Sequence, residues 1–376
     1  MSNPYLDRIY LKKYTGVNFQ NDWQDYCDSL KVDRYSRPIR IMVYIGVLNV
    51  AYYRAFAPFM ELAKKPDYEI RMANLFGNRD DMDWADIVYF QRVTDRNIIS
   101  ESVRAREMGK KIIYDTDDYM HGLPAHHPHK RTIENSRYLI DQDELCKICD
   151  AVTVSTDYLK KVYAERYPVP ITVLPNCIRT EDYECSTVNR FKEGRVYLGW
   201  AGSSTHFHDL AIVAPALREL AAKHANLSLV TFNYHGIEKQ PYQDAFDGFP
   251  MDRRVHIGGT QPHMLSNFMR LFDIGIAPLL TNDFNRSKSN CKFLEYAMSH
   301  VPMVASDLEP YRPDRGCSVL IGSNANDWYR ALDDLITDPD RRRKLADKAE
   351  VWTHKRYDIK RAIGVWENLI NKLADR

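Results

Sequence analysis

The sequence lacks the long hydrophobic runs that membrane proteins need. No apolar stretch approaches the ~20 residues required to span a bilayer. The first residues also carry no apolar core of the kind found in signal peptides. The 7 cysteines are scattered and odd in number, a pattern typical of reduced thiols and not of a disulfide framework. We therefore expect a cytoplasmic protein with no stable membrane insertion.

An excess of charge of one sign is lacking as well. The chain has 52 Lys and Arg residues against 51 Asp and Glu residues, which leaves a net charge of +1. Nonspecific binding to nucleic acids depends on a strongly positive surface, so the composition does not favour a polyanionic partner, although a local patch could still bind one. The sequence also contains neither a Gly-x-Ser-x-Gly nor a Walker motif.

What the chain does have is a repeated alternation of short apolar strands and helices. Its 376 residues, 44% of them hydrophobic, suit two domains that each bury a core. Two series of strands alternate with helices, which predicts two doubly wound α/β domains with parallel sheets. The strands of the first series lie at 39–45, 68–72, 87–90, 111–115, 151–154 and 171–174. Those of the second series lie at 196–200, 227–232, 255–257, 274–277, 301–305 and 319–321.

Residues 284–306 carry the strongest functional signal. They form a polar loop, a helix that opens near Ser289, and a buried strand. A helix N-terminus presents unpaired N–H groups and the positive end of the helix dipole, which suits a phosphate. Lys288 and Lys292 add two positive charges there, and Glu295 could accept hydrogen bonds from the two hydroxyls of a ribose. The segment therefore predicts a site for a nucleotide-sugar.

This segment resembles the donor site of the retaining GT-B glycosyltransferases of the large family-four group. There, a Lys-Ser-x-x-Lys-x-x-Glu-Tyr-Ala run leads into a Pro-Val-Val-Ala-Ser strand. The resemblance implies the GT-B fold, in which two Rossmann-like domains face each other across a cleft. It also implies a donor domain at 186–357 and an acceptor domain at 38–185, onto which a last helix within 358–376 crosses back. Residues 1–37 would be an N-terminal extension, with a helix at 22–30.

A second wall of the donor pocket is predicted after the first strand of the second domain. Small residues there allow close approach of the backbone to a ligand. The run from Gly199 to His206, closed by Asp209 and Leu210, resembles the Gly-Trp-x-Gly-Ser-x-x-Thr-His form found in part of the family. The expected donor-binding residues of this wall are Gly202, Ser203, Ser204 and Thr205.

Two departures from the family pattern shift the expected roles. Residues 203–208 contain no Arg or Lys, so the diphosphate charge must fall on Lys288, Lys292 and the backbone amides of Ser289 and Asn290. Ser287 also replaces the glutamate that many members carry eight positions before the ribose carboxylate. Contacts to the sugar are therefore expected from Asn285, Arg286 or Ser287.

The acceptor is expected at Tyr114–His121 in the first domain. Three carboxylates within four residues follow a strand there and repel one another, so their proximity needs a reason. The functional interpretation places Asp117, Asp118 and His121 at the cleft, with Arg92 from the preceding strand. A solvated loop with helix caps is an equal alternative. Metal binding by an Asp-x-Asp motif belongs to a single-domain fold that the double βαβ pattern contradicts, so no metal is expected.

Together these features predict a metal-independent transferase that moves a sugar from a nucleoside diphosphate, guessed to be UDP, to a hydroxyl acceptor, and the resemblance implies that the anomeric configuration is retained. No cofactor is expected. Lys288, Lys292, Asp118 and His121 are the candidate catalytic residues. The acceptor is expected to be a glycan or a lipid-linked sugar. A hydroxymethylated DNA base, a nucleotide-sugar epimerase and an inactive nucleotide-sugar binder remain as alternatives, and the oligomeric state is not predicted.

Overall fold

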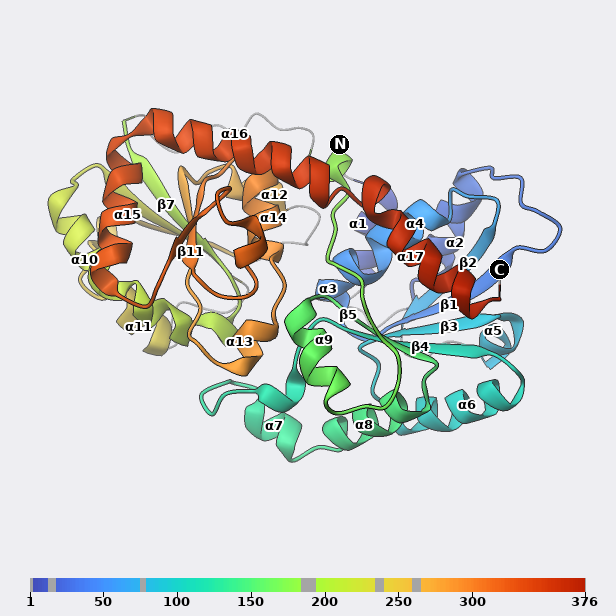
Figure 1. The fold of residues 1–376 in the computed structure, drawn as a ribbon. Helices are drawn as coiled ribbons and strands as arrows, with labels where there is room; N and C mark the ends of the chain where they lie inside the picture. The colour runs from blue at the N-terminus through green and yellow to red at the C-terminus, as the bar shows by residue number, and fades with distance from the viewer. Residues whose placement is uncertain are drawn as a thin grey trace.

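The chain folds around two parallel six-stranded sheets, seen at the right and the left of Figure 1. The structure is a computed structural model, and it describes residues 3–12, 18–74, 79–183, 194–233, 240–258 and 265–375. Every strand pairing within the two sheets is parallel. Parallel strands need crossover connections, and helices supply them in both domains.

The first sheet has the strand order β2-β1-β3-β4-β5-β6. Strand β1, next to the edge strand β2, pairs on both sides, since Ile41 is opposite Ile70 of β2 and Ile87 of β3. The strands are β1 (Ile39–Ile45), β2 (Tyr68–Asn74), β3 (Ile87–Gln91), β4 (Lys111–Thr116), β5 (Ala151–Val154) and β6 (Ile171–Val173). The helices between them are α3 (Leu48–Ala51), the π-helical turn η1 (Tyr52–Phe56), α4 (Ala57–Leu62), α5 (Arg79–Trp84), α6 (Arg96–Glu107), α7 (Lys130–Glu134), α8 (Tyr138–Ile148) and α9 (Asp157–Ala164).

The second sheet has the order β12-β11-β10-β7-β8-β9. Its strands are β7 (Val196–Ala201), β8 (Leu227–Asn233), β9 (Arg254–Gly258), β10 (Ile274–Ala277), β11 (Met303–Ser306) and β12 (Val319–Ile321). Its helices are α10 (Ala214–Lys223), α11 (Gln240–Phe246), α12 (Leu265–Met269), α13 (Asp283–Ser287), α14 (Cys291–Met298), α15 (Ala325–Thr337) and α16 (Pro339–Arg356). All twelve predicted strands are present, so the two doubly wound domains are confirmed.

The last two helices connect the domains. In Figure 1, α16 runs along the second domain and α17 (Ile359–Leu373) continues over the first. Trp366 of α17 packs edge-on against Phe59 of α4, with ring centroids 5.9 Å apart. Tyr68 of β2 donates a hydrogen bond to Asn371 over 2.9 Å. The C-terminal helix thus belongs to the core of the first domain.

Three local predictions need correction. The N-terminal segment contains two helices, α1 (Pro4–Lys12) and α2 (Gln20–Ser29), where one was predicted. Trp23 of α2 donates to the carbonyl of Ile70 over 2.9 Å, which fixes α2 against β2. The sequence of residues 133–149 predicts one helix, but the structure has two, α7 and α8. Ser136 lies between them, and its Oγ donates to the Ile133 carbonyl over 2.8 Å and accepts the N–H of Tyr138 over 3.1 Å. The sequence of residues 52–64 predicts an ordinary helix, which in the structure opens with the π-helical turn η1.

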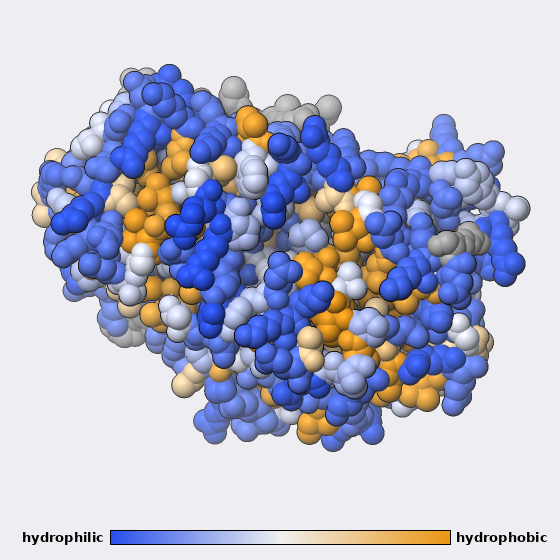
Figure 2. Space-filling model, in the orientation of Figure 1, coloured by the Kyte–Doolittle hydropathy of each residue, from blue (hydrophilic) through white to orange (hydrophobic). Residues whose placement is uncertain are grey.

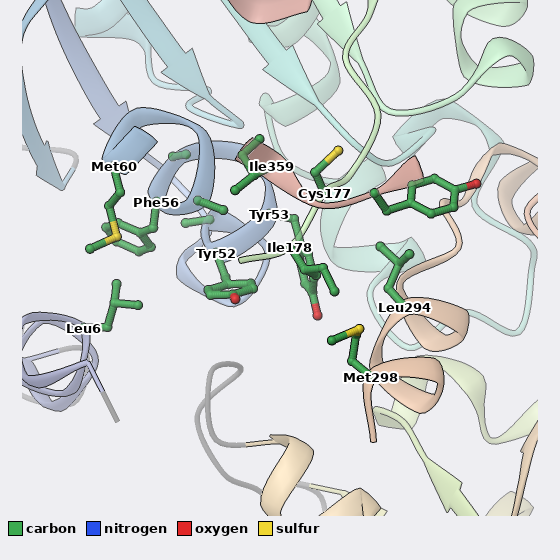
Figure 3. Packing of buried hydrophobic residues seen from close by; sticks show 14 of the residues in the cluster. Leu6, Tyr52, Tyr53, Phe56, Met60, Cys177, Ile178, Leu294, Met298 and Ile359 are labelled. Atoms are coloured by element: carbon green, nitrogen blue, oxygen red, sulfur yellow. The ribbon is translucent and has the colours of Figure 1, made fainter. Parts of the chain in front are cut away.

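One buried apolar cluster extends through both domains. Figure 3 shows part of it, where Tyr52 and Tyr53 of η1 lie in one cluster with Ile178, which follows β6, and with Leu294 and Met298 of α14. In the face shown in Figure 2, hydrophilic residues cover most of both domains, with smaller hydrophobic areas among them. Within the described parts of the chain, no helix is long and apolar enough to cross a membrane.

Candidate active site

A cavity of about 410 Å³ lies between the two domains. Its walls come from the carboxyl ends of parallel strands in both sheets, which is where open α/β sheets bind ligands. From the first domain, Val47 follows β1, Arg92 follows β3 and Asp117 follows β4. From the second domain, Gly202 follows β7 and Pro278 follows β10. The two domains therefore contribute to a single site.

The N-terminus of α14 forms one wall of this cavity. Its N-cap residue Asn290 makes no side-chain cap, because the amide of Asn290 donates instead to Asp314 over 2.7 Å. The first turn of α14 is thus left without the side-chain acceptor that usually satisfies a helix N-terminus. Ser289, Lys292 and Glu295 line the cavity around this turn. A helix end of this kind, with a lysine beside it, suits a bound anion.

Both lysines of the predicted phosphate site are ion-paired. Lys288 Nζ lies 3.3 Å from Asp118 across the cleft, and Lys292 Nζ lies 3.0 Å from Glu295 Oε2 within α14. The other oxygen of Glu295 accepts a hydrogen bond from Tyr53 of the first domain over 2.6 Å. The Lys288 ammonium also lies 4.1 Å from the ring centre of Phe284, a cation–π contact. Each lysine could exchange part of these contacts for a phosphate oxygen.

On the first-domain side, Arg92 joins the two predicted acceptor carboxylates. Its Nη1 lies 3.2 Å from Asp117 and 2.9 Å from Asp118. The backbone of Arg92 has φ +51°, an uncommon conformation for a non-glycine residue. A Cβ atom on Gly46 would lie 2.4 Å from the Arg92 carbonyl oxygen, so only glycine allows this close approach of the two strand ends. The arginine is thus held in place from both its backbone and its side chain.

The pKa values of Asp117 and Asp118 are shifted in opposite directions. Burial raises the pKa of Asp117, and the neighbouring charge of Asp118 raises it further. Burial also acts to raise the pKa of Asp118, but the charges of Lys288 and Arg92 outweigh it, so that this pKa falls below its ordinary value. Asp118 is thus the firmly ionised member, and it lies between Arg92 of the first domain and Lys288 of the second.

The wall after β7 is ordered by Asp209. This carboxylate lies 2.8 Å from His206 Nδ1, and its other oxygen accepts the N–H of Leu280 and the amide of Asn285, each over 2.9 Å. Burial lowers the pKa of His206, and the charge of Lys288 lowers it further. Gly202 lies under the Trp200 ring, at a distance where a Cβ would clash. His206 therefore presents a neutral imidazole to the cavity.

Most of the predicted site residues meet in this cavity. Those that line it are Arg92, Asp117, Asp118, Gly202, Ser203, Thr205, Lys288, Ser289, Lys292 and Glu295. They come from loops up to about 200 positions apart in the sequence, and the structure brings them together at one interface.

Six predicted site residues do not line the cavity: His121, Ser204, Asn285, Arg286, Ser287 and Asn290. The Nε2 atom of His121 lies 2.8 Å from Asp143 Oδ1, inside the first domain. Arg286 donates to Glu309 over 2.6 Å and lies over the ring of Tyr158.

The remaining four are also held within the protein. Asn285 is buried and its amide donates to Asp209 and to the Leu280 carbonyl, each over 2.9 Å. Ser287 is buried and donates to the Asp283 carbonyl over 2.7 Å, Asn290 donates to Asp314, and Ser204 is buried in a 3₁₀ turn. None of these six side chains lines the cavity, because each is used in local packing or pairing.

The structure also adds residues that the sequence did not indicate. Tyr53 lines the cavity from η1, and no motif in the sequence marks it. His127 also lines the cavity; it is buried and packs against Phe284 with ring centroids 5.1 Å apart. Burial lowers the pKa of His127 to about 4, with a further contribution from Lys288, so it adds no charge at neutral pH. Its proximity to Lys288 could be recognised only in three dimensions.

A metal site at the acidic stretch finds no support in the side-chain positions. Asp115 is fully buried, and its carboxylate is used by Arg54 and by Thr153 Oγ1, which donates over 2.7 Å. Asp115 therefore does not line the cavity, whereas Asp117 does. Within the described ranges, no three His, Cys, Asp or Glu side chains are gathered in a way that could hold a metal ion. Independence from metals stays a prediction.

Comparison with solved structures identifies the fold of this chain. No family model and no curated protein sequence matches this chain. Its structure is similar to a glycosyltransferase from Rickettsia africae ESF-5, with a TM-score of 0.64, 12% identity, and 90% of this chain and 99% of that chain covered. It is also similar to sucrose-phosphate synthase from Thermosynechococcus elongatus, with a TM-score of 0.62, 9% identity, and coverage of 89% and 99%.

A third similar structure is a UDP-forming α,α-trehalose-phosphate synthase from Burkholderia xenovorans, with a TM-score of 0.60, 12% identity, and coverage of 90% and 99%. At such low identities these similarities establish the fold alone. The chain has the GT-B fold, as its sequence predicted, with two doubly wound α/β domains and the cavity between them.

Proposed function

We propose that this chain is a glycosyltransferase that moves a sugar from a nucleoside diphosphate to a hydroxyl acceptor with retention and without a metal ion. One observation carries the proposal. Lys288, Lys292, Glu295 and the uncapped N-terminus of α14 all face one interdomain cavity. A diphosphate needs positive groups and N–H donors, and a ribose needs a hydrogen-bond acceptor about one helical turn away. These needs are met by α14 and the residues directly before it.

The charges of the site suit a leaving diphosphate. During transfer, the bond between the sugar anomeric carbon and the phosphate oxygen breaks, and the acceptor oxygen bonds to that carbon. The acceptor proton passes to the departing phosphate oxygen on the same face, as the family resemblance implies. Negative charge grows on the diphosphate, where Lys288, Lys292 and the first N–H groups of α14 would stabilise it.

The acceptor would enter from the first-domain side, beside Asp117 and Asp118. These carboxylates are fixed by Arg92, so they can accept hydrogen bonds from sugar hydroxyls without moving. Met120 and Phe284 add apolar surface to the same part of the cavity. A neutral glycan or lipid-linked sugar suits this lining, because carboxylates would repel an anionic acceptor close to the reacting hydroxyl.

The proposal is tested by a thermal-shift screen of UDP-, GDP-, ADP-, TDP- and CDP-sugars, followed by turnover of the donor that binds. Release of the nucleoside diphosphate that increases with added saccharide supports transfer. Release of an epimerised sugar without acceptor would favour an epimerase, and binding without turnover an inactive binder. Transfer to hydroxymethylated DNA that falls steeply with salt would favour the phage-type alternative. Failure of all five donors to bind would contradict the proposal.

A further inference from the structure

The π-helical turn η1 of the first domain contacts helix α14 of the second domain. The hydroxyl of Tyr53 donates to Glu295 Oε1 over 2.6 Å, although the two residues lie 242 positions apart and in different domains. Both side chains are only 4% exposed, and both line the cavity. Figure 3 shows Tyr53 extending from the first domain toward Leu294 and Met298 of α14. π-Helical turns are rare and often occur at functional sites.

The next residue of the same turn supports a second link to α14. Arg54 is fully buried, bound to Asp115 at the centre of the first sheet, and its Nη1 donates to Asn176 Oδ1 over 3.1 Å. The amide of Asn176 then donates to Ser289 Oγ over 2.7 Å and to Cys291 Sγ over 3.1 Å. Consecutive residues of η1 thus act on both ends of the segment that is expected to bind the diphosphate and the ribose.

The contact leaves room for a ligand. The cavity of about 410 Å³ exists while Tyr53 and Glu295 are in contact, so a nucleotide need not break their hydrogen bond to enter. A carboxylate oxygen can accept more than one hydrogen bond. A ribose hydroxyl could therefore share the carboxylate with Tyr53 and Lys292.

We propose that Tyr53 is a positioning residue for nucleotide binding: it orients the carboxylate of Glu295 from the opposite domain and so makes nucleotide affinity depend on closure of the cleft. This inference rests on the proposed function, in which Glu295 binds the ribose. Because Tyr53 and Glu295 belong to different domains, separation of the domains would break their hydrogen bond, and a nucleotide held by both domains needs the closed arrangement. Apparent affinity falls with the fraction of molecules in the competent state, so loss of the bond weakens nucleotide binding.

The test is isothermal titration of the full chain with whichever of UDP, GDP, ADP, TDP and CDP gives the largest thermal shift. Tyr53→Phe keeps the ring and its packing and removes only the hydroxyl. We expect it to weaken binding roughly 10-fold, as is typical for loss of a hydrogen bond to a charged group. Tyr26→Phe is the matched control, since its buried hydroxyl donates to the Met60 carbonyl away from the cavity, and it should bind as the wild type does.

A double-mutant cycle separates positioning from a general structural role. If Tyr53 acts through Glu295, Tyr53→Phe should have little further effect in a Glu295→Gln background, or on the 2′,3′-dideoxy form of the same nucleotide. Unchanged or tighter binding by Tyr53→Phe, or an equal loss in both backgrounds, overturns the inference. If Tyr53→Phe gives one of those results, but the wild type binds the nucleotide and Glu295→Gln weakens that binding, the proposed function survives. If the wild type binds none of the five nucleotides, both fail.

Discussion

Replacement of Glu295 by glutamine should weaken nucleotide binding through the ribose alone. The carboxylate is 4% exposed, and its two oxygens are held by Tyr53 and Lys292. A hydrogen bond to a charged acceptor contributes about 1.5–3 kcal/mol and a neutral one about 0.5–1.5 kcal/mol. The glutamine carbonyl can still accept a neutral bond, so the difference is about 1–2 kcal/mol, which is about a 5- to 30-fold rise in Kd.

The assay compares three ligands by isothermal titration: the nucleoside diphosphate selected in the screen, its 2′,3′-dideoxy form, and inorganic pyrophosphate. Only the first should lose affinity in Glu295→Gln. Pyrophosphate should bind no more weakly, because Lys292 loses its ion-pair partner and becomes freer to bind phosphate. Glu61→Gln is the matched control. Glu61 is also buried, and its Oε1 lies 2.6 Å from Nζ of Lys64, three residues later in the chain. It does not line the cavity.

Unchanged nucleotide affinity in Glu295→Gln would refute the ribose assignment. So would a loss that is equally large for pyrophosphate, because that would place Glu295 in the phosphate site or in the general stability of α14. Melting temperatures of the two glutamine variants decide whether a loss reflects unfolding, and the variant at Glu61 sets the scale for removal of a buried, lysine-paired charge.

The other predictions concern charge, metal and pH. Lys288→Ala and Lys292→Ala should lower kcat by about 10- to 1000-fold at saturating donor while leaving the affinity for the free nucleoside nearly unchanged; full turnover by either variant would remove that lysine from the leaving-group role. EDTA should leave transfer intact, and a complete loss restored by Mn²⁺ would contradict metal independence. The pKa of His127 is lowered to about 4 by burial and by Lys288, from about 6.5 in an unfolded chain. Its contribution to stability is therefore complete above about pH 6.5 and is lost as the pH falls toward 4. Between about pH 7 and 5, the melting temperature of His127→Gln should therefore fall less than that of the wild type. An equal fall in the two proteins would contradict this prediction.

The strands were predictable because parallel sheets bury both faces. Their sequences are nearly continuous apolar runs, and the predicted 39–45 matches β1 (Ile39–Ile45). Local helix breaks were less visible. The division near Ser136 is accompanied by two hydrogen bonds of the Ser136 hydroxyl, to the Ile133 carbonyl and from the Tyr138 N–H, with no glycine or proline to mark it. The π-helical turn at Tyr52–Phe56 also has no local signal, since its sequence suits an ordinary helix.

The donor side of the site was predictable to the extent that it is local. Lys288, Lys292 and Glu295 lie within two turns of each other, so their spacing alone suggested a common wall. Arg286 lies in the same stretch, but its orientation is decided by Glu309, 23 residues later. Tyr53 is placed by a contact across 242 residues, which no pattern in the sequence could reveal.

The most direct test of the account is a crystal structure of the chain bound to the nucleoside diphosphate selected in the thermal-shift screen. The account predicts the diphosphate at the N-terminus of α14, within hydrogen-bonding distance of Lys288 and Lys292. The ribose hydroxyls should lie on Glu295, with Tyr53 still bound to the same carboxylate. A nucleotide bound outside the interdomain cavity, or in the cavity with its phosphates away from both lysines, would contradict the central claim.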